Sequence, residues 1–223
     1  MFKKMRISAV LFAVLLNITG CNKFAATLGN ADAQYNVGLA YETGYGETKD
    51  FAKALEWYTK AAENGQPDAQ CNLAAMYEDG NGTVQDYKKA LYWFNKAAAQ
   101  GYVIAEFNLG VMYSNGKGTS QDSKAAFGWY LKAAEKGYSA AQFNMGNMFA
   151  KSTESSKDMI IAYALYSVAS SKDSNILESA IHNRNQVMRS FNQQQAFEAQ
   201  ELAKELAKEN NLKNALFSYI KKD

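Results

Sequence analysis

Apolar and polar positions recur along this chain with a period of 36 residues. The motif Ala-Gln-Tyr-Asn-Val-Gly that begins at Ala33 returns, with some positions changed, at Ala69, Ala105 and Ala141, and no residue is inserted between copies. A second set of positions keeps the same spacing: Trp57-Tyr58, Trp93-Phe94, Trp129-Tyr130 and Leu165-Tyr166. Because chance does not hold so many positions in phase, the pattern predicts a repeat array.

Each copy is predicted to form two helices joined by a glycine turn. In the first copy Ala33, Val37, Ala40 and Tyr41 fall on one helical face. The segment Gly44-Tyr45-Gly46 then interrupts the helix, because glycine readily takes positive φ. Asp50 is placed to cap the second helix, and its equivalents are Asp86 and Asp122. The apolar stripe predicted for that helix consists of Ala54, Trp57, Tyr58, Ala61 and Ala62. One such hairpin cannot bury its own apolar face, so neighbouring copies must stack.

These residues resemble the Sel1-like repeat, a relative of the tetratricopeptide repeat. The shared pattern is AQxNLGxxYxxGxGxxxDxxKAxxWYxKAAxxG, and units 33–68, 69–104 and 105–140 match it closely. The fourth unit, 141–173, lacks both glycines and the tryptophan. The resemblance implies an all-α, right-handed superhelical solenoid of four helix-turn-helix repeats over 31–173 that binds proteins or peptides. Residues 174–223 resemble the C-terminal capping helices and tail of the family.

In arrays of this kind the first helix of each pair lines the concave surface, so its outward positions are candidate partner contacts. These positions are Tyr35, Asn36, Leu39, Glu42, Asn72, Ala75, Glu78, Phe107, Asn108, Val111, Ser114 and Asn144. We expect positions 39, 42, 75, 78, 111 and 114 to be exposed. Two alternatives remain open: the aromatic residues wedge against the adjacent first helix, and the asparagines hydrogen-bond a neighbouring loop.

The N-terminus reads as a targeting signal followed by a lipid attachment site. Lys3, Lys4 and Arg6 precede an apolar run that is short for a membrane span. The segment Ile18-Thr19-Gly20-Cys21 resembles a bacterial lipobox. This resemblance implies a lipoprotein signal peptide over 1–20, acylation of Cys21 and a lipid-attached tether over 21–30. The tether would reach roughly 30 Å when extended. The alternative is an ordinary cleaved signal in which Cys21 occurs by chance.

The residue that follows Cys21 indicates to which membrane a lipoprotein of this type would be sent. Asn22 stands where an aspartate marks inner-membrane retention in many Gram-negative lipoproteins. The resemblance therefore implies an outer-membrane lipoprotein that faces the periplasm, with surface exposure as an alternative.

Composition narrows the function further. Without Lys3, Lys4 and Arg6, acidic residues outnumber basic ones by one, which argues against nucleic acid as a partner. One histidine and two cysteines leave too few ligands for most metal sites, and no cofactor motif is present. If Cys21 carries lipid, Cys71 has no disulfide partner and is predicted to be a buried apolar residue.

The predicted function is a non-catalytic scaffold or adaptor for other proteins. His182 lies far in sequence from any nucleophile in the repeats, and Ser218-Tyr219-Ile220-Lys221 matches S-x-x-K without its partner motifs. One alternative is a β-lactam-hydrolysing or peptidoglycan-acting enzyme, like the cysteine-rich Sel1-like proteins, although this chain lacks their repeat disulfides. Another alternative is an exported factor that binds host proteins.

Overall fold

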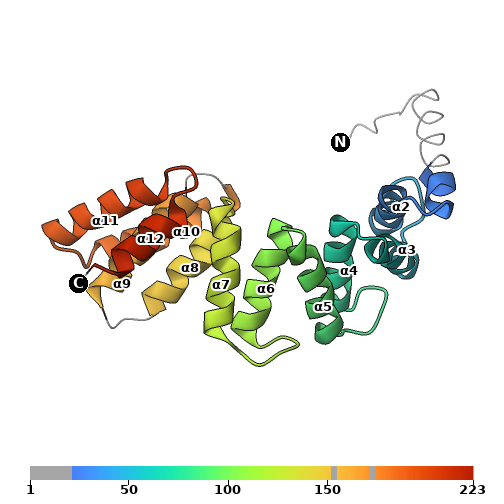
Figure 1. Ribbon diagram of the computed structural model, residues 1–223, viewed down its shortest axis with the longest axis horizontal. Coiled ribbons are helices and arrows are strands. Elements are labelled where there is room, and N and C mark those ends of the chain that lie inside the picture. Colours follow the sequence, from blue (N-terminus) through green and yellow to red (C-terminus); the bar gives the residue numbers. More distant parts are fainter. Residues whose placement is uncertain (1–21, 152–154, 171–173, 223) are drawn as a thin grey trace, which may run out of the picture. The chain divides into compact units, whose positions relative to one another are not determined.

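The computed structural model describes residues 22–151, 155–170 and 174–222, and every regular element in these ranges is a helix (Figure 1). The labelled helices are α2 (Ala31–Thr43), α3 (Phe51–Glu63), α4 (Pro67–Asp79), α5 (Tyr87–Ala99), α6 (Val103–Asn115), α7 (Ser123–Glu135), α8 (Ser139–Lys151), α9 (Ser156–Ala169), α10 (Ser174–Met188), α11 (Gln193–Leu206) and α12 (Leu212–Ile220). The all-α prediction is therefore confirmed.

The chain divides into two compact units. The first unit is Met1–Ala105 with Lys117–Thr119, and the second unit is Glu106–Gly116 with Ser120–Asp223. In the first unit α3 contacts both α2 and α4, and α4 contacts α5. In the second unit α8 contacts α7 and α9, while α9 also contacts α10 and α11. Each predicted helical hairpin is thus stacked against a neighbour.

Local sequence signals set the helix ends. Gly44 and Gly80 follow α2 and α4 in the left-handed conformation, with φ of 80° and 76°. Asp50 begins α3 by accepting a hydrogen bond from the Lys53 amide at 3.0 Å. Asp86 and Asp122 cap α5 and α7 in the same way. The predicted turn and capping residues are confirmed at these positions.

The core of the first unit is built from small side chains around one buried tyrosine. Tyr58 is fully buried, and it packs with alanines of α3 and with Leu73 and Met76 of α4. Trp57 was predicted to share this apolar stripe, but it is only half-buried, and the Lys60 ammonium lies 4.3 Å from its ring centroid. The structure therefore places Trp57 at the edge of the core, where its ring contacts a cation.

A buried glutamine near the start of each first helix ties successive helices together. The Gln34, Gln70 and Gln142 side-chain amides each donate to the carbonyl eight residues earlier in the chain. The Gln34 side-chain oxygen also accepts from Asn64, and that of Gln70 accepts from Gln100 at 2.8 Å. One side chain thus satisfies the end of the preceding helix and the end of the second helix in its own repeat.

The third repeat replaces this glutamine by a charged pair. Glu106 is 4% exposed, and its Oε1 lies 2.7 Å from Lys136 Nζ. Its Oε2 is buried and has no hydrogen-bond partner among the described residues. In the fourth repeat Gln142 Oε1 is also buried without a hydrogen-bond partner among the described residues. Lys172, the residue equivalent to Lys136 in that repeat, lies outside the described residues.

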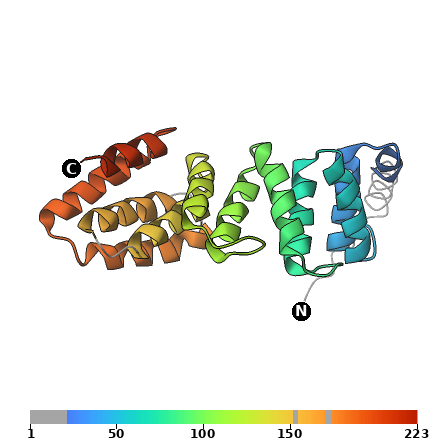
Figure 2. The same cartoon turned by 60° about the horizontal axis from the view of Figure 1, so that its bottom comes forward.

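The second unit closes around α9. Along this helix Ile160 to Tyr166 are all buried, because α8, α10 and α11 pack around it. The equivalent helix α7 begins at Ser123, so the repeat period of 36 residues places the start of α9 at residue 159. The helix instead begins three residues earlier, at Ser156, and the Ser155 hydroxyl caps it. Beyond it α12 contacts α11 and α7, and Figure 2 shows α12 running beside α11.

The residues before α2 differ from the extended linker expected over 21–30. Residues 22–27 are helical, Ala26 is 2% exposed, and the Ala26 carbonyl accepts a hydrogen bond from Gln34. Lys23 forms an ion pair with Glu47. Residues 22–27 are therefore part of the folded structure, and the predicted signal peptide and Cys21 lie outside the described residues.

Candidate partner-binding surface

A groove of about 200 Å³ lies in the second unit between the end of α6 and the end of α8. It is lined by Val111, Ser114, Asn115, Tyr130, Asn144, Asn147, Met148 and Lys151. Val111, Ser114 and Asn144 are among the predicted partner contacts. We call this hollow the α6–α8 groove.

The base of the α6–α8 groove is a tyrosine held in place by a glycine. Tyr130 is 3% exposed, and a Cβ atom built on Gly110 would lie only 2.5 Å from its ring. The ring therefore occupies space that only glycine leaves free. Burial raises the pKa of Tyr130 above its ordinary value, and hydrogen bonds with Asn144 and Ser114 oppose part of that rise. The hydroxyl stays protonated and neutral at physiological pH.

The walls of the groove combine two apolar side chains with several polar ones. Val111 on α6 and Met148 on α8 are half-buried. Asn147 accepts hydrogen bonds from the Tyr166 hydroxyl at 2.8 Å and from Asn183 at 3.2 Å. An asparagine amide offers both donors and acceptors, so this lining can hydrogen-bond a peptide backbone.

The predicted aromatic positions pack inside their own repeats. Tyr35 stacks on Tyr58 with a ring-centroid distance of 5.7 Å. Phe107 lies 5.8 Å from Tyr130, and Phe143 lies 5.6 Å from Tyr166. Each aromatic ring thus contacts the tyrosine of the second helix in the same repeat. Tyr35 also packs against the cluster that contains Leu73 of α4, and Phe107 lies 5.1 Å from Tyr138, which directly precedes α8. These rings therefore contact the adjacent first helix as well, which limits the surface they can offer to a partner.

The predicted asparagines do not form a uniform row. Asn72 hydrogen-bonds the hydroxyls of Tyr35 and Tyr58, and Asn144 hydrogen-bonds Tyr130. Each of these two asparagines therefore hydrogen-bonds a tyrosine on the second helix of the preceding repeat. The alternative of a hydrogen bond to a neighbouring loop is not what these two residues show. Asn36 is exposed beside a small hollow near residue 22, and Asn108 is half-buried.

The positions expected to be exposed are all half-buried. Leu39 packs against the core of the first unit, and Ala75 is also half-buried. Glu42 accepts a hydrogen bond from the Tyr58 hydroxyl at 2.5 Å, and Glu78 lies 2.7 Å from Lys117 Nζ. Full exposure is therefore not observed at these positions, but each side chain keeps some exposed surface. Packing engages Leu39, and internal polar contacts engage Glu42 and Glu78.

Sequence reasoning missed part of the groove. Asn147, Met148 and Lys151 line it from α8 together with Asn144, which is a predicted contact. Their spacing of three, four and seven residues places them on one helical face. The sequence already contains that spacing. It also contains a second signal: the position held by the apolar Val111 in the third repeat is held by the polar Asn147 in the fourth.

The remaining candidate chemistry is sparse in the described part of the chain. His182 is exposed and lies 3.4 Å from the Gln186 amide, and Ser218 is exposed on α12. No group of three or more His, Cys, Asp or Glu side chains among the described residues is arranged to hold a metal. Cys71 is buried and free as predicted, and burial raises its pKa to about 12. None of the described helices has the length and apolar character of a membrane span.

Comparison with solved structures identifies similar repeat proteins. A Sel1 repeat protein from Oxalobacter formigenes is 28% identical, with a TM-score of 0.68 over 85% of this chain and 78% of that chain. The protein c5321, a protective antigen present in uropathogenic Escherichia coli strains that displays an SLR fold, is 29% identical with a TM-score of 0.55. That match covers 92% of this chain and 51% of c5321, so the chain spans about half the length of that relative.

Family comparison assigns the repeats directly. The Sel1 repeat matches residues 31–66, 67–102, 103–138 and 139–174, two residues ahead of the phase chosen from the sequence. No curated protein gave a significant match. Proteins of this repeat class are typically scaffolds for protein interaction and are generally non-catalytic. The four contiguous repeats cover more than half of the chain, which therefore belongs to the Sel1 repeat family.

Proposed function

We propose that this chain is a non-catalytic adaptor that holds an extended segment of a partner protein in the α6–α8 groove. The observation that carries the proposal is the lining of this groove, in which asparagine amides stand beside Val111 and Met148. The amides can pair with a peptide backbone, and the two apolar side chains can bury a side chain of the segment. Lys151 adds a positive charge to the lining, which favours a segment with a carboxylate nearby.

The test is retention of partners from an envelope extract by the full chain and by the Val111→Glu/Met148→Glu variant. Two carboxylates placed in the groove should reduce the captured partner at least tenfold, because they would be desolvated on binding. The matched control is Val84→Glu/Ile104→Glu, which makes the same chemical change at exposed positions outside the groove. Equal capture by all three proteins, each shown to be folded by circular dichroism, would remove the groove from the proposal.

We further propose that a lipid on Cys21 anchors the chain to the outer membrane, facing the periplasm. The lipobox-like residues 18–21 motivate this location, and two features of the structure support it. A helix over residues 22–27 directly follows the proposed attachment point, so a lipid there would hold the folded chain close to the membrane. Phe24 and Leu28 are 67% and 72% exposed, so they offer apolar contacts to a lipid surface.

Metabolic labelling with a palmitate analogue tests the anchor. The wild-type chain should be labelled and sediment with membranes, and Cys21→Ser should abolish both properties. Cys71→Ser is the matched control, and it should leave the label in place. The relative c5321 is a protective antigen, so protease treatment of intact cells should also be performed. Protection from the protease favours the periplasmic side, and cleavage favours the cell surface.

A further inference from the structure

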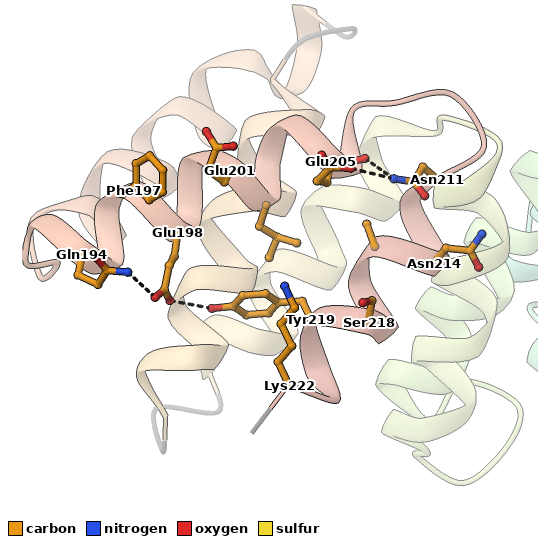
Figure 3. Close-up of a pocket in the computed structure, with 12 residues that line it drawn as sticks. Gln194, Phe197, Glu198, Glu201, Glu205, Asn211, Asn214, Ser218, Tyr219 and Lys222 are labelled. Atoms are coloured by element: carbon orange, nitrogen blue, oxygen red, sulfur yellow. Dashed lines mark hydrogen bonds between the residues drawn. The ribbon is translucent and has the colours of Figure 1, made fainter.

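A second groove lies at the C-terminal end of the second unit, away from the residues of the α6–α8 groove. It runs between α11 and α12 and has a volume of about 530 Å³ (Figure 3). The two helices are joined by the short segment 207–211. We call this hollow the α11–α12 groove.

The floor of the α11–α12 groove is apolar. Leu202 of α11 and Ala215 of α12 line it, and Leu202 is 5% exposed. Leu206 and Leu216 are also buried on these two helices, so the groove rests on packed side chains. At its rim Phe197 is 60% exposed, which makes it the most exposed large apolar side chain in the described part of the second unit. Phe197 therefore adds uncovered apolar surface at the rim of the groove.

One wall of the groove carries a line of carboxylates. Glu198, Glu201 and Glu205 follow one another along α11 at spacings of three and four residues, and Figure 3 shows them on the helix that faces α12. Lys222 is the one basic residue in the lining. Among the lining residues, acidic side chains therefore outnumber basic ones by two, and Lys204 and Lys208 lie just outside the lining beside Glu201 and Glu205.

These carboxylates are available to a partner because their present contacts are exposed or long. Glu201 and Glu205 pair with Lys204 and Lys208 one turn along the same exposed face. Exposed pairs of this kind contribute only about 0–1 kcal/mol, so a cation from another molecule can replace them. The Glu198 carboxylate accepts from the Gln194 amide at 2.9 Å and from the Tyr219 hydroxyl at 3.4 Å.

Tyr219 on α12 faces the Glu198 carboxylate, which affects the pKa of its hydroxyl. Burial and the neighbouring Glu198 carboxylate raise the pKa of Tyr219 to about 12. The phenol is therefore neutral at physiological pH, and the wall opposite the carboxylates presents hydroxyl and amide groups from Asn214, Ser218 and Tyr219 (Figure 3). These groups add hydrogen-bonding capacity without adding positive charge that would compete with a ligand.

We propose that the α11–α12 groove binds a cationic amphipathic segment of a partner protein. Lysine or arginine side chains of the segment pair with Glu198, Glu201 and Glu205, and its apolar side chains contact Leu202 and Phe197. Gln194 to Glu205 span roughly 17 Å at 1.5 Å per helical residue, so a segment of about three helical turns matches the wall. An anionic lipid surface is disfavoured because the wall would repel it. This site is distinct from the α6–α8 groove and gives the adaptor a second place to bind protein.

The probe is a fluorescent helical peptide of leucine and lysine, about twelve residues long, with the lysines on one face. Its binding to the full chain in zwitterionic detergent is measured by fluorescence anisotropy, with empty micelles as the blank. We expect saturable binding that weakens as salt is added, because the pairing is electrostatic. The same peptide with glutamate in place of lysine should not bind.

Variants locate the site. Glu201→Lys/Glu205→Lys should weaken peptide binding at least tenfold, and Phe197→Ser should weaken it about three- to tenfold with no change in unfolding temperature. The matched control Glu56→Lys/Glu63→Lys makes the same charge change at exposed positions of α3 in the first unit and should keep the wild-type affinity. Val111→Glu/Met148→Glu should also keep it, so this test can fail independently of the proposed function.

Four results would overturn the proposal. One is a peptide affinity that Glu201→Lys/Glu205→Lys leaves unchanged. Another is an equal loss of affinity in Glu56→Lys/Glu63→Lys, which would show that the peptide senses only the net charge of the protein. A third is binding to anionic vesicles that depends on Phe197, which would make the occupant a membrane. The fourth is a doubling of molecular mass that Phe197→Ser abolishes, which would make the occupant a second copy of this chain.

Discussion

At the scale of single residues, the buried glutamine of the first two repeats connects three parts of the chain. Gln70 donates to the Ala62 carbonyl at 3.0 Å and accepts from the Gln100 amide at 2.8 Å. It is 3% exposed, so neither contact is easily replaced by water. In the third repeat Glu106 and Lys136 supply an ion pair at the same positions. Where the first-helix residue changes from Gln70 to Glu106, the second-helix residue changes from Gln100 to Lys136, so a hydrogen-bond donor still faces an acceptor.

We expect Gln70→Ala to lower the free energy of unfolding by about 1–3 kcal/mol, because a buried carbonyl would lose its partner. Urea denaturation followed by circular dichroism measures the change. Gln200→Ala, at an exposed position of α11, is the control and should have almost no effect. A Gln70→Ala midpoint equal to that of the wild type would show that this glutamine is not needed for stacking.

Cys71 provides a prediction that depends on pH. Burial raises its pKa from 9.0 to about 12, so the folded chain keeps the thiol neutral where an unfolded chain would ionise it. The stability that this group contributes is complete below pH 9 and declines as the pH rises from 9 to 12.

In a Cys21→Ser chain the remaining thiol should therefore react with a disulfide reagent at pH 8 only after denaturant is added. The rate of colour release measures the reaction. Rapid reaction of the native chain would show that Cys71 is not protected by burial.

At the scale of elements, the second glycine of the turns in the second and third repeats allows adjacent repeats to approach. A Cβ atom on Gly82 would lie 2.9 Å from the Ala52 amide nitrogen and still closer to the Phe51 carbonyl. Gly118 meets the Tyr87 carbonyl in the same way. The turn of one repeat therefore touches the start of the second helix in the preceding repeat, at a place where no side chain fits.

We expect Gly82→Ala to destabilise the first unit clearly more than Gly65→Ala does. Both glycines have positive φ, 71° and 88°, but no atom lies within 4 Å of a Cβ on Gly65. Gly65→Ala thus reports the cost of the backbone conformation, about 1–2 kcal/mol, and the excess in Gly82→Ala reports the collision. Similar thermal unfolding temperatures for the two variants would contradict this explanation.

At the scale of the whole molecule, the terminal helices complete the second unit. α9 is buried over most of its circumference, and α10 and α11 pack against it. A repeat array needs a terminal element with one polar face, because its last repeat has no further repeat to cover it. Leu202 and Leu206 of α11 face inward, whereas Lys204 and Lys208 nearby are exposed.

A chain that ends at Ser190 should therefore be poorly soluble and unfold at a lower temperature. It lacks α11 and α12, so apolar residues of α9 such as Leu165 would lose their cover. A chain that ends at Ile220 is the control, since residues 221 and 222 are exposed. Sedimentation of cell extracts and thermal unfolding measure the difference. A soluble and equally stable chain ending at Ser190 would show that α11 is not a cap.

Much of the fold could be predicted from sequence because its signals are local and repeated in phase. Asp50, Gly44 and Pro67 specify helix ends through their own backbone and side-chain chemistry, and the tertiary structure does not alter these preferences. The fourth repeat was harder to predict, since it lacks the glycines, and α9 begins at Ser156 with a different capping residue.

The candidate site was predicted less well, because side-chain pairing depends on neighbours that a single helix does not reveal. Glu42 and Asn72 face outward on a helical wheel, yet both hydrogen-bond Tyr58. Ser114 and Asn144, both predicted partner contacts, line the groove, and only the structure places the buried Tyr130 beneath them.

The sequence by itself determined the helical repeats, their period and most of their ends, because local backbone preferences recur every 36 residues. Only the tertiary structure decided which polar side chains are already paired and where hollows remain. The α11–α12 groove is the clearest case: α11 and α12 lie outside the repeats, so no periodicity predicts how they pair. Packing of their buried leucines sets that pairing, and with it the line of carboxylates beside the apolar floor.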